Sequence, residues 1–256
     1  MNEHQAKERA AGVEGQRAAK FPLFFAKSAF FGPRPSKDKV AKINNGTVTL
    51  ADLGAGPIAF TCQHVIECYR QRCDEEGAII FQIGNVELNP VEQLLAEDGK
   101  RDIATIRLTD EQVGHITSGG QIGSSLFCPN EWPSRLPRKG EFIAFGGFPG
   151  RLREVKSFDE LEFGSWSSGA SGISSVSETQ FVSAFEREFW VRSFGVEEHL
   201  ALSILGGLSG GPALMNRGDH WDLLGIVSQY HKDYDAMFFS LLSCVRPDGS
   251  IEPLPV

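Results

Sequence analysis

The sequence predicts an all-β protein, and three observations carry this prediction. The 256 residues include 28 glycines and 13 prolines, which favour frequent turns. The apolar segments are short and typical of strands, as at residues 47–50 (TVTL) and 142–145 (FIAF). The chain also lacks a regular alternation of strands with long helices, which an α/β fold requires. A chain of this length can bury a substantial core in one or two domains.

The beginning of the chain, residues 1–34, is predicted to form an N-terminal arm. Residues 1–20 are polar and rich in alanine, so they favour a short exposed helix or a loose segment. They contain no apolar core of a secretory signal, and no apolar run in the chain is long enough to span a membrane. Residues 21–25 (FPLFF) and 30–31 are too apolar to be left exposed, so we expect them to pack against the body of the fold.

The first of two predicted halves spans residues 35–128. Residues 42–53 predict a β-hairpin with its turn at residues 44–46 (NNG). An apolar strand follows and runs into a polar, helix-like stretch, and His64 lies at that junction. Asp102 stands at the head of a later apolar strand. Both side chains are therefore expected at strand ends, where a rigid scaffold presents functional groups.

The second half is predicted to span residues 129–256, and its boundary with the first half lies within the turn-rich residues 109–140. Residues 164–177 are rich in serine and glycine, which suggests a loop or a long hairpin end. Residues 221–228 and 237–242 are predicted to form core strands.

Charge and cysteine content limit the partners. The formal net charge of −8 argues against a nucleic-acid partner, which would require a basic surface. The five cysteines are an odd number and no signal peptide precedes them, so we expect reduced thiols and a cytoplasmic protein that does not bind a membrane. The spacing of Cys62, Cys68 and Cys73 is unlike that of zinc sites. We expect neither a metal ion nor another cofactor.

Residues 206–212 (GGLSGGP) carry the clearest chemical signal. Glycine reaches backbone angles that other residues avoid, so the N–H groups of Gly207 and Ser209 can turn toward one point. Such a pair of donors binds a carbonyl oxygen as it becomes an oxyanion. The Ser209 hydroxyl would lie at the same point as a nucleophile, but it needs a base and a group that orients the base.

His64 and Asp102 are the predicted base and orienting carboxylate. Asp98 is a nearby competitor, but it lies in a solvated charged segment. The serine motif also fits the G-x-S-x-G elbow of α/β-hydrolases, with Asp222 and His231 available as later partners. The short segment that follows the serine and the strand-rich chain before it argue against that alternative.

Three sequence blocks together resemble a known family. Residues 61–65 (TCQHV), 102–108 (DIATIRL) and 207–212 (GLSGGP) resemble the signature blocks of trypsin/chymotrypsin-like serine peptidases, in the family order. They are most similar to the bacterial, disulfide-free branch that includes the HtrA-type proteases, although no PDZ-like segment is expected. The resemblance covers about residues 35–250 and implies two antiparallel six-stranded β-barrels, one in each half, forming one peptidase domain.

The resemblance also implies a function. It implies that the protein is a serine endopeptidase, which forms an acyl-enzyme intermediate through His64, Asp102 and Ser209. The backbone N–H groups of Gly207 and Ser209 would be the oxyanion donors. Leu208 stands where many secreted members carry an aspartate that pairs with a new N-terminus. Activation by N-terminal cleavage is therefore not expected. We expect instead that a regulatory protein partner controls the protein inside the cell. The alternative is a catalytically silent fold that binds a peptide or protein.

The resemblance assigns substrate binding to four further residues. Ser203 matches the floor of the specificity pocket, and because it is not an aspartate it argues against cleavage after Lys or Arg. Ser228, Gln229 and Tyr230 match the strand that pairs with the substrate backbone. Tyr230 replaces a glycine that opens the pocket in many members, so a small or medium apolar residue before the scissile bond is expected.

Overall fold

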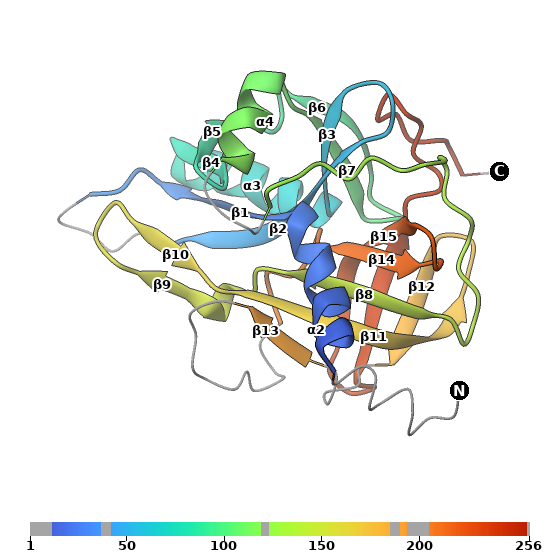
Figure 1. Ribbon diagram of the computed structural model, residues 1–256. Helices are drawn as coiled ribbons and strands as arrows, with labels where there is room; N and C mark the ends of the chain where they lie inside the picture. The colour runs from blue at the N-terminus through green and yellow to red at the C-terminus, as the bar shows by residue number, and fades with distance from the viewer. Residues whose placement is uncertain (1–11, 37–41, 119–122, 185–189, 194–204, 255–256) are drawn as a thin grey trace.

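A computed structural model describes residues 12–36, 42–118, 123–184, 190–193 and 205–254, and it is built mainly from β-strands (Figure 1). Two antiparallel sheets of seven strands each form most of this part of the chain. The all-β class predicted from the sequence is therefore confirmed. Within the same ranges, no helix is both long and apolar enough to cross a membrane.

The first sheet contains the strands β1 (Ala26–Pro33), β2 (Asn44–Asp52), β3 (Pro57–Thr61), β4 (Ile79–Ile83), β5 (Val86–Leu88), β6 (Leu94–Asp98) and β7 (Ile103–Arg107). Their order is β5–β4–β1–β2–β3–β7–β6. The edge strands β5 and β6 do not pair with each other in the described ranges, so this sheet is open and curled. Helices α3 (Gln63–Glu76) and α4 (Asp110–Thr117) lie beside it (Figure 1).

The second sheet contains the strands β8 (Phe142–Gly147), β11 (Ser165–Val176), β12 (Gln180–Ala184), β13 (Trp190–Ser193), β14 (Pro212–Asn216), β15 (Trp221–His231) and β16 (Ala236–Leu241). Their order is β12–β16–β15–β14–β8–β11–β13, and β11 also pairs with β12. That last pairing closes six strands into a barrel. The prediction of two six-stranded barrels is thus correct for one barrel only, because the other sheet has seven strands and stays open.

Strand β11 makes this closure possible. Residues 164–177, predicted to form a loop or a long hairpin end, are mostly this one strand, which makes a hairpin with β12. One edge of β11 pairs with β8, while the other pairs first with β13 and then, past a bulge, with β12. Its small residues serve packing rather than turning: Ser167, Ser168 and Ser171 are buried, and a Cβ on Gly169 would lie 2.6 Å from Ala19 Cβ.

The turn predicted at residues 44–46 is also wrong, because these residues begin β2. Asn45 pairs with Phe30 of β1, and its side-chain amide donates to the carbonyl of Phe148 at 3.0 Å. Gly46 lies against Val65 of α3. Contacts from distant parts of the chain therefore satisfy the polar groups that suggested a turn.

The N-terminal arm is shorter than the predicted 1–34. Helix α2 (Val13–Lys20) and a 3₁₀ segment, η1 (Phe21–Phe25), precede β1, which lies inside the first sheet between β2 and β4. Helix α2 crosses β11 (Figure 1). The Phe21 ring stacks on Trp221 at 4.6 Å between centroids, and Pro22, Leu23 and Phe25 are buried as expected. Phe24 departs from the expectation, because it is 37% exposed. The remaining small sheet is a hairpin of β9 (Arg153–Val155) and β10 (Leu161–Phe163), which follows the short 3₁₀ segment η2 (Gly150–Leu152).

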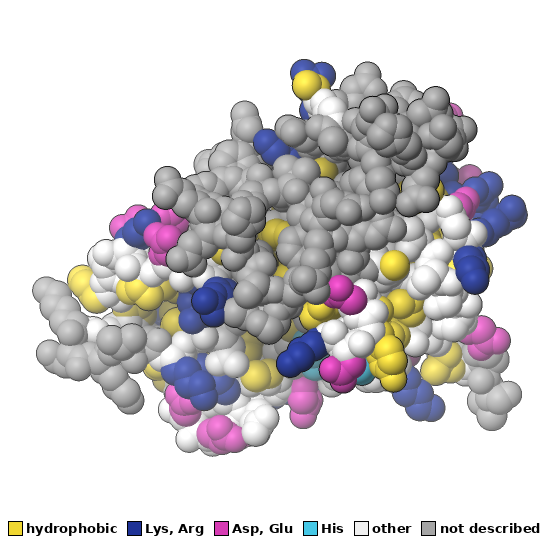
Figure 2. Space-filling view, turned by 90° about the horizontal axis from the view of Figure 1, so that it is seen from below, with side chains coloured by type: hydrophobic (Ala, Val, Ile, Leu, Met, Phe, Trp, Pro, Cys, Tyr) yellow, Lys and Arg dark blue, Asp and Glu magenta, His cyan; other side chains and the backbone are white. Residues whose placement is uncertain are grey.

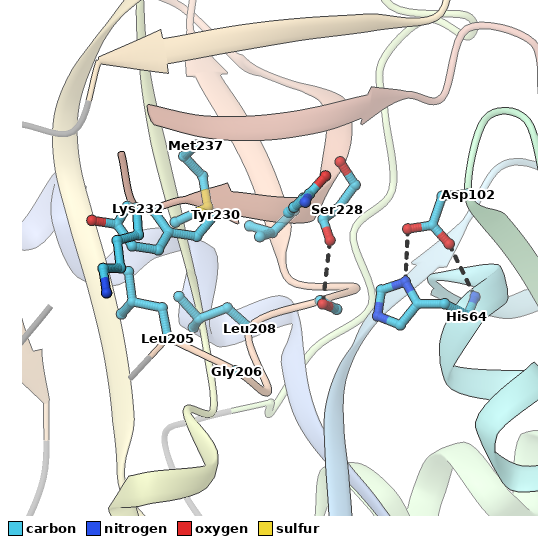
Figure 3. Close-up of a pocket in the computed structure, with 12 residues that line it drawn as sticks. His64, Asp102, Leu205, Gly206, Leu208, Ser228, Tyr230, Lys232 and Met237 are labelled. Carbon is cyan, nitrogen blue, oxygen red and sulfur yellow. Dashed lines mark hydrogen bonds and ion pairs between the residues drawn. The ribbon is translucent and has the colours of Figure 1, made fainter. Parts of the chain in front are cut away.

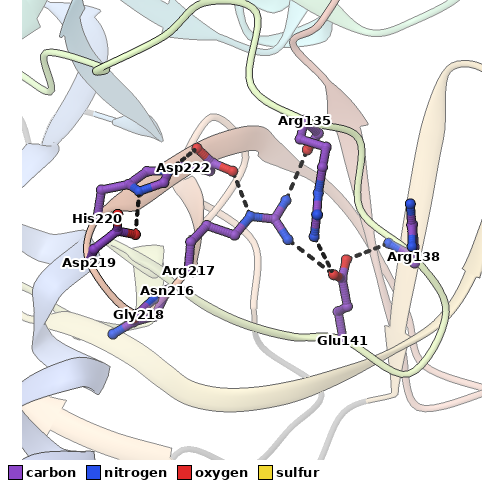
Figure 4. Close-up of polar contacts among 9 residues, drawn as sticks. All are labelled: Arg135, Arg138, Glu141, Asn216, Arg217, Gly218, Asp219, His220 and Asp222. Carbon is purple, nitrogen blue, oxygen red and sulfur yellow. Dashed lines mark hydrogen bonds and ion pairs between the residues drawn. The ribbon is translucent and has the colours of Figure 1, made fainter.

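A charged cluster joins the connecting segment before β8 to the β14–β15 hairpin (Figure 4). The largely buried Arg217 guanidinium donates to Asp222 at 2.6 Å, to Glu141 at 3.0 Å and to the Arg135 carbonyl at 3.0 Å. This cluster fixes the hairpin whose first strand continues from the serine motif. Elsewhere on the surface, the described face in Figure 2 has acidic and basic side chains interspersed rather than one basic area.

Candidate active site

His64 lies in the first turn of α3, directly after β3. Cys62 precedes the helix with extended backbone angles, and Val65 and Ile66 are buried beneath it. The His64 side chain remains 52% exposed. Val65 and Ile66 therefore anchor the start of the helix, and the His64 imidazole is left accessible.

Asp102 lies in the tight connection between β6 and β7. Its φ of 54° is in the left-handed region, which Asp tolerates better than most residues with a Cβ. Its Oδ1 accepts a hydrogen bond from the His64 backbone N–H at 3.0 Å, and its Oδ2 lies 2.8 Å from His64 Nδ1. The competing Asp98 pairs instead with Arg101 at 2.8 Å and holds the same turn from the other side.

The pairing sets the charge of Asp102 and the tautomer of His64. Burial raises the pKa of Asp102, but the hydrogen bonds from the His64 ring and backbone outweigh it and leave the pKa below its usual value. An ionised carboxylate beside Nδ1 favours a proton on that nitrogen. The other ring nitrogen, Nε2, is then the one that can accept a proton.

Ser209 lies in the glycine-rich turn before β14. Gly207 and Gly210 have φ values of 102° and 93°, which L side chains rarely adopt. A Cβ on Gly210 would collide with the carbonyl oxygen of Thr47. The glycines are therefore required both by the backbone angles and by the close approach of strand β2.

Thr47 of β2 orders this turn, a role that sequence reasoning missed. Its backbone N–H donates to the Ser209 carbonyl at 2.9 Å, and its hydroxyl donates to the Gly207 carbonyl at 2.7 Å. The same hydroxyl accepts from the Phe148 N–H at 3.0 Å. Leu208, at the position where secreted members of the resembled family carry an aspartate, is buried. The first sheet thus holds the serine turn through hydrogen bonds from Thr47.

The Ser209 hydroxyl lies in the pocket without engaging the imidazole. Ser209 Oγ donates to the Ser228 carbonyl at 3.4 Å (Figure 3), and no hydrogen bond joins it to His64 among the described residues. Within those ranges the N–H groups of Gly207 and Ser209 likewise have no hydrogen-bond acceptor. Two unused donors beside a serine hydroxyl are what an oxyanion site requires.

The pocket has a volume of about 480 Å³ and lies between the two sheets. Its lining residues are His64, Asp102, Leu205, Gly206, Leu208, Ser209, Val227, Ser228, Gln229, Tyr230, Lys232 and Met237. The structure therefore brings together His64, Asp102 and Ser209 with three of the four predicted substrate-binding residues. The fourth, Ser203, lies outside the described residues.

Lys232 and Met237 line the pocket but were missed in the sequence. Met237 stands opposite Tyr230 in the β15–β16 register, and Lys232 begins the turn between these strands. The strand pattern and the turn sequence at residues 232–235 could have indicated this hairpin, but the register across it could not be read from the sequence.

Cys62 lies behind the pair formed by His64 and Asp102. Its thiol donates to the Val227 carbonyl at 3.1 Å, and the Gly210 N–H donates to the same oxygen at 2.8 Å. Burial raises the pKa of the thiol well above its usual value, and the charge of Asp102 adds to the effect.

A metal ion would need this thiol in its charged form. The ligand atoms of Cys62, His64 and Asp102 lie within 4.8 Å of one another. However, the raised pKa keeps the thiol protonated, and the other two side chains are bonded to each other. These three residues do not fit a metal site in this arrangement.

The alternative partners Asp222 and His231 lie elsewhere. Asp222 pairs with Arg217 at 2.6 Å, and the His231 ring contacts the Tyr234 ring at 4.7 Å between centroids. Neither residue lines the pocket of Ser209. Together with the all-β architecture, these contacts argue against the α/β-hydrolase alternative.

Comparison with known proteins gives similarity in structure only. No protein-family model matches the sequence, and no curated protein sequence matches it. Among solved structures, the tobacco vein mottling virus protease is 15% identical, with 84% of this chain and 76% of that chain covered and a TM-score of 0.42. The catalytically inactive tobacco etch virus protease, complexed with substrate, is 13% identical, with coverages of 87% and 80% and a TM-score of 0.45.

A third similar structure is the thermostable serine protease AL20 from an extremophilic microorganism. It is 12% identical, with 86% of this chain and 91% of that chain covered and a TM-score of 0.45. All three proteins are proteases by name. At such identities and TM-scores, the similarities do not by themselves define the family or the function of this chain.

Proposed function

We propose that this protein is a serine endopeptidase of the trypsin/chymotrypsin-like type. The observation that carries the proposal is the 2.8 Å contact between His64 Nδ1 and Asp102, in the same pocket as Ser209. The N–H groups of Gly207 and Ser209 have no hydrogen-bond acceptor among the described residues. These groups are a base, an orienting carboxylate, a hydroxyl and an oxyanion site, the set that acyl transfer requires.

In the proposed reaction, Ser209 Oγ attacks the carbonyl carbon of the scissile peptide while His64 Nε2 accepts the hydroxyl proton. Asp102 keeps the Nδ1 proton and stabilises the charged imidazole. The N–H groups of Gly207 and Ser209 donate to the oxyanion. The C–N bond then breaks, His64 gives its proton to the leaving amine, and an ester to Ser209 remains. Water attacks this ester, with His64 accepting a water proton and returning a proton to Ser209 Oγ.

The end of β15 supports a peptide as the substrate. Strand β14 pairs with β15 only as far as Ile226, and the turn at residues 210–211 bonds to Val227. Beyond that point, no strand of the described ranges pairs with Ser228 and Gln229 on this side of β15. A substrate backbone can add to such an edge as an extra strand, which would deliver its scissile bond to Ser209.

Attack requires the Ser209 hydroxyl to turn from the Ser228 carbonyl toward His64 Nε2. This movement involves a rotation about the Cα–Cβ bond of Ser209. We include control by a regulatory protein partner in the proposal, since substrate or partner binding is a means of selecting the productive rotamer. The five free thiols support a reducing, cytoplasmic location as part of the same proposal.

Labelling with a fluorophosphonate probe tests the proposal directly. The wild-type protein should become covalently labelled and should cleave an unstructured protein substrate. Ser209→Ala should lose both activities, whereas Ser174→Ala, on the exposed face of β11, should keep both. If Ser209 stays unlabelled with and without peptide substrates and a lysate from the host, the hydrolase proposal is wrong.

A binding module is the second candidate, and the Ser209 contact with Ser228 favours it. A hydroxyl that donates to a backbone carbonyl is not activated as a nucleophile. This alternative predicts that peptides bind to the β15 edge with no turnover and no labelling. Titration of fluorescent peptides into wild-type and Ser209→Ala proteins, with parallel product analysis, distinguishes the two functions.

A further inference from the structure

One charge in the pocket has no counter-charge among the residues that the structure describes. His64 and Asp102 are bonded to each other at 2.8 Å. Lys232 is the remaining charged lining residue, and it forms no ion pair within the described ranges. In Figure 3 its ammonium lies at the end of the pocket away from His64 and Asp102.

Apolar side chains also line the pocket. They are Leu205, Leu208, Val227 and Met237, and three of them are at least 97% buried. The Tyr230 ring lies beside Lys232 (Figure 3), and its hydroxyl donates to Asp235 at 2.7 Å. This bond fixes the ring as one wall next to the ammonium. The pocket therefore offers hydrocarbon contacts together with a cation at its far end.

We propose that Lys232 selects an acidic side chain at the substrate residue directly before the scissile bond. The inference rests on the proposed endopeptidase function and names the substrate class for it. A glutamate or aspartate fits both features, because its methylene groups contact the apolar walls and its carboxylate meets the ammonium. The net charge of −8 gives the protein no general attraction for acidic peptides, so such a preference must arise locally.

The proposal replaces the apolar preference expected from the sequence. That expectation used Ser203 and Tyr230, whereas Lys232 enters the pocket through the turn of the β15–β16 hairpin. Lys232 is exposed, so solvent weakens its interaction with a carboxylate. We expect about a tenfold higher kcat/KM for glutamate than for its neutral isostere glutamine, decreasing as salt is raised.

Matched peptides test the inference. A peptide series should differ only at the residue before the cleaved bond, with Glu, Gln, Leu or Lys at that place. Wild type should prefer Glu, Lys232→Met should cleave the Glu and Gln peptides equally, and Lys232→Glu should prefer Lys. Lys139→Met removes the same charge from an exposed site outside the pocket and should keep the preference for Glu. A wild-type preference for Gln or Leu, or a Glu preference that survives Lys232→Met, would overturn the inference.

Two readouts separate this inference from the proposed function. Fluorophosphonate labelling of Ser209 reports on the hydrolase alone, whatever the peptide preference. The same peptides are also titrated into Ser209→Ala, where fluorescence anisotropy measures binding without turnover. Labelling together with equal binding of Glu and Gln peptides rejects only the role of Lys232. Tighter binding of Glu peptides without labelling supports the role of Lys232 and rejects the hydrolase.

Discussion

Replacing Asp102 by asparagine tests the proposed mechanism at its most sensitive contact. The shape of the side chain is retained, and the amide oxygen can still accept the His64 backbone N–H, now at 3.0 Å. The amide nitrogen then replaces the oxygen that lies 2.8 Å from Nδ1. Because an amide nitrogen donates and does not accept, the imidazole must move its proton to Nε2. The base then has no free electron pair facing Ser209.

The expected loss is large and specific to catalysis. A wrong tautomer in a Ser-His-Asp site costs about 10⁴ in kcat, which corresponds to about 5 kcal/mol of transition-state stabilisation. Single-turnover acylation and fluorophosphonate labelling should both slow by this factor at neutral pH. Peptide binding, measured in the Ser209→Ala background, should change less than threefold, because the pocket walls keep their positions.

Stability gives an independent check with a defined pH dependence. The folded-state pKa of Asp102 is lowered, so the contribution of its ionised form to stability is present above the unfolded-state pKa of about 3.9. The contribution is lost as the pH falls through the lower folded-state value. Asp102→Asn should therefore reduce the free energy of unfolding at pH 7, and the difference from wild type should shrink below pH 4.

Asp98→Asn is the matched control, since Asp98 lies in the same turn and contacts Arg101 instead of His64. It should lower the thermal midpoint while leaving the acylation rate within tenfold of wild type. The reasoning is refuted if Asp102→Asn acylates within tenfold of wild type, or if both variants lose the same factor in rate.

Two further predictions concern contacts of the serine turn, and a third concerns the charged cluster around Arg217. Cys62→Ala removes the hydrogen bond to the Val227 carbonyl, whereas Cys62→Ser keeps a donor there, so kcat/KM of the alanine variant should be about tenfold lower than that of the serine variant. Thermal melts of both variants will show whether unfolding explains the loss. Gly210→Ala forces a Cβ against a β2 carbonyl, so it should abolish labelling of the serine and cost about 3 kcal/mol; near-wild-type labelling would contradict this geometry. Arg217→Met leaves Asp222 largely buried without its guanidinium, so urea unfolding should reveal a loss of about 2–3 kcal/mol with peptide affinity unchanged, and an unchanged midpoint would count against the cluster in Figure 4.

The sequence predicts the strands better than the way they close. Apolar segments such as β3 and β16 are visible because alternation and short length are local properties. The serine- and glycine-rich β11 resembles a loop, because its small residues are explained only by α2 packing across it. The Asn-Asn-Gly segment resembles a turn for the same reason, since its partners lie elsewhere in the chain, as with Asn45 and Phe148, which are 103 residues apart in sequence.

The candidate site divides in the same way. His64, Asp102 and Ser209 were selected by residue type and motif, and the structure brings all three to one pocket. Thr47 and Lys232 carry no motif, and their importance arises from strand register and from a turn that faces the pocket. The rotamer of Ser209 is likewise a matter of local contacts that no sequence pattern encodes.

The sequence alone determined the all-β class and the residue types available for acyl transfer, because both depend on local pattern and chemical identity. The tertiary structure decided that one sheet closes while the other stays open and that β2 orders the serine turn. It also decided that a lysine without an ion pair among the described residues lies at the end of the pocket. These features depend on which distant segments meet, and the free energy of those contacts is not a property of any one segment.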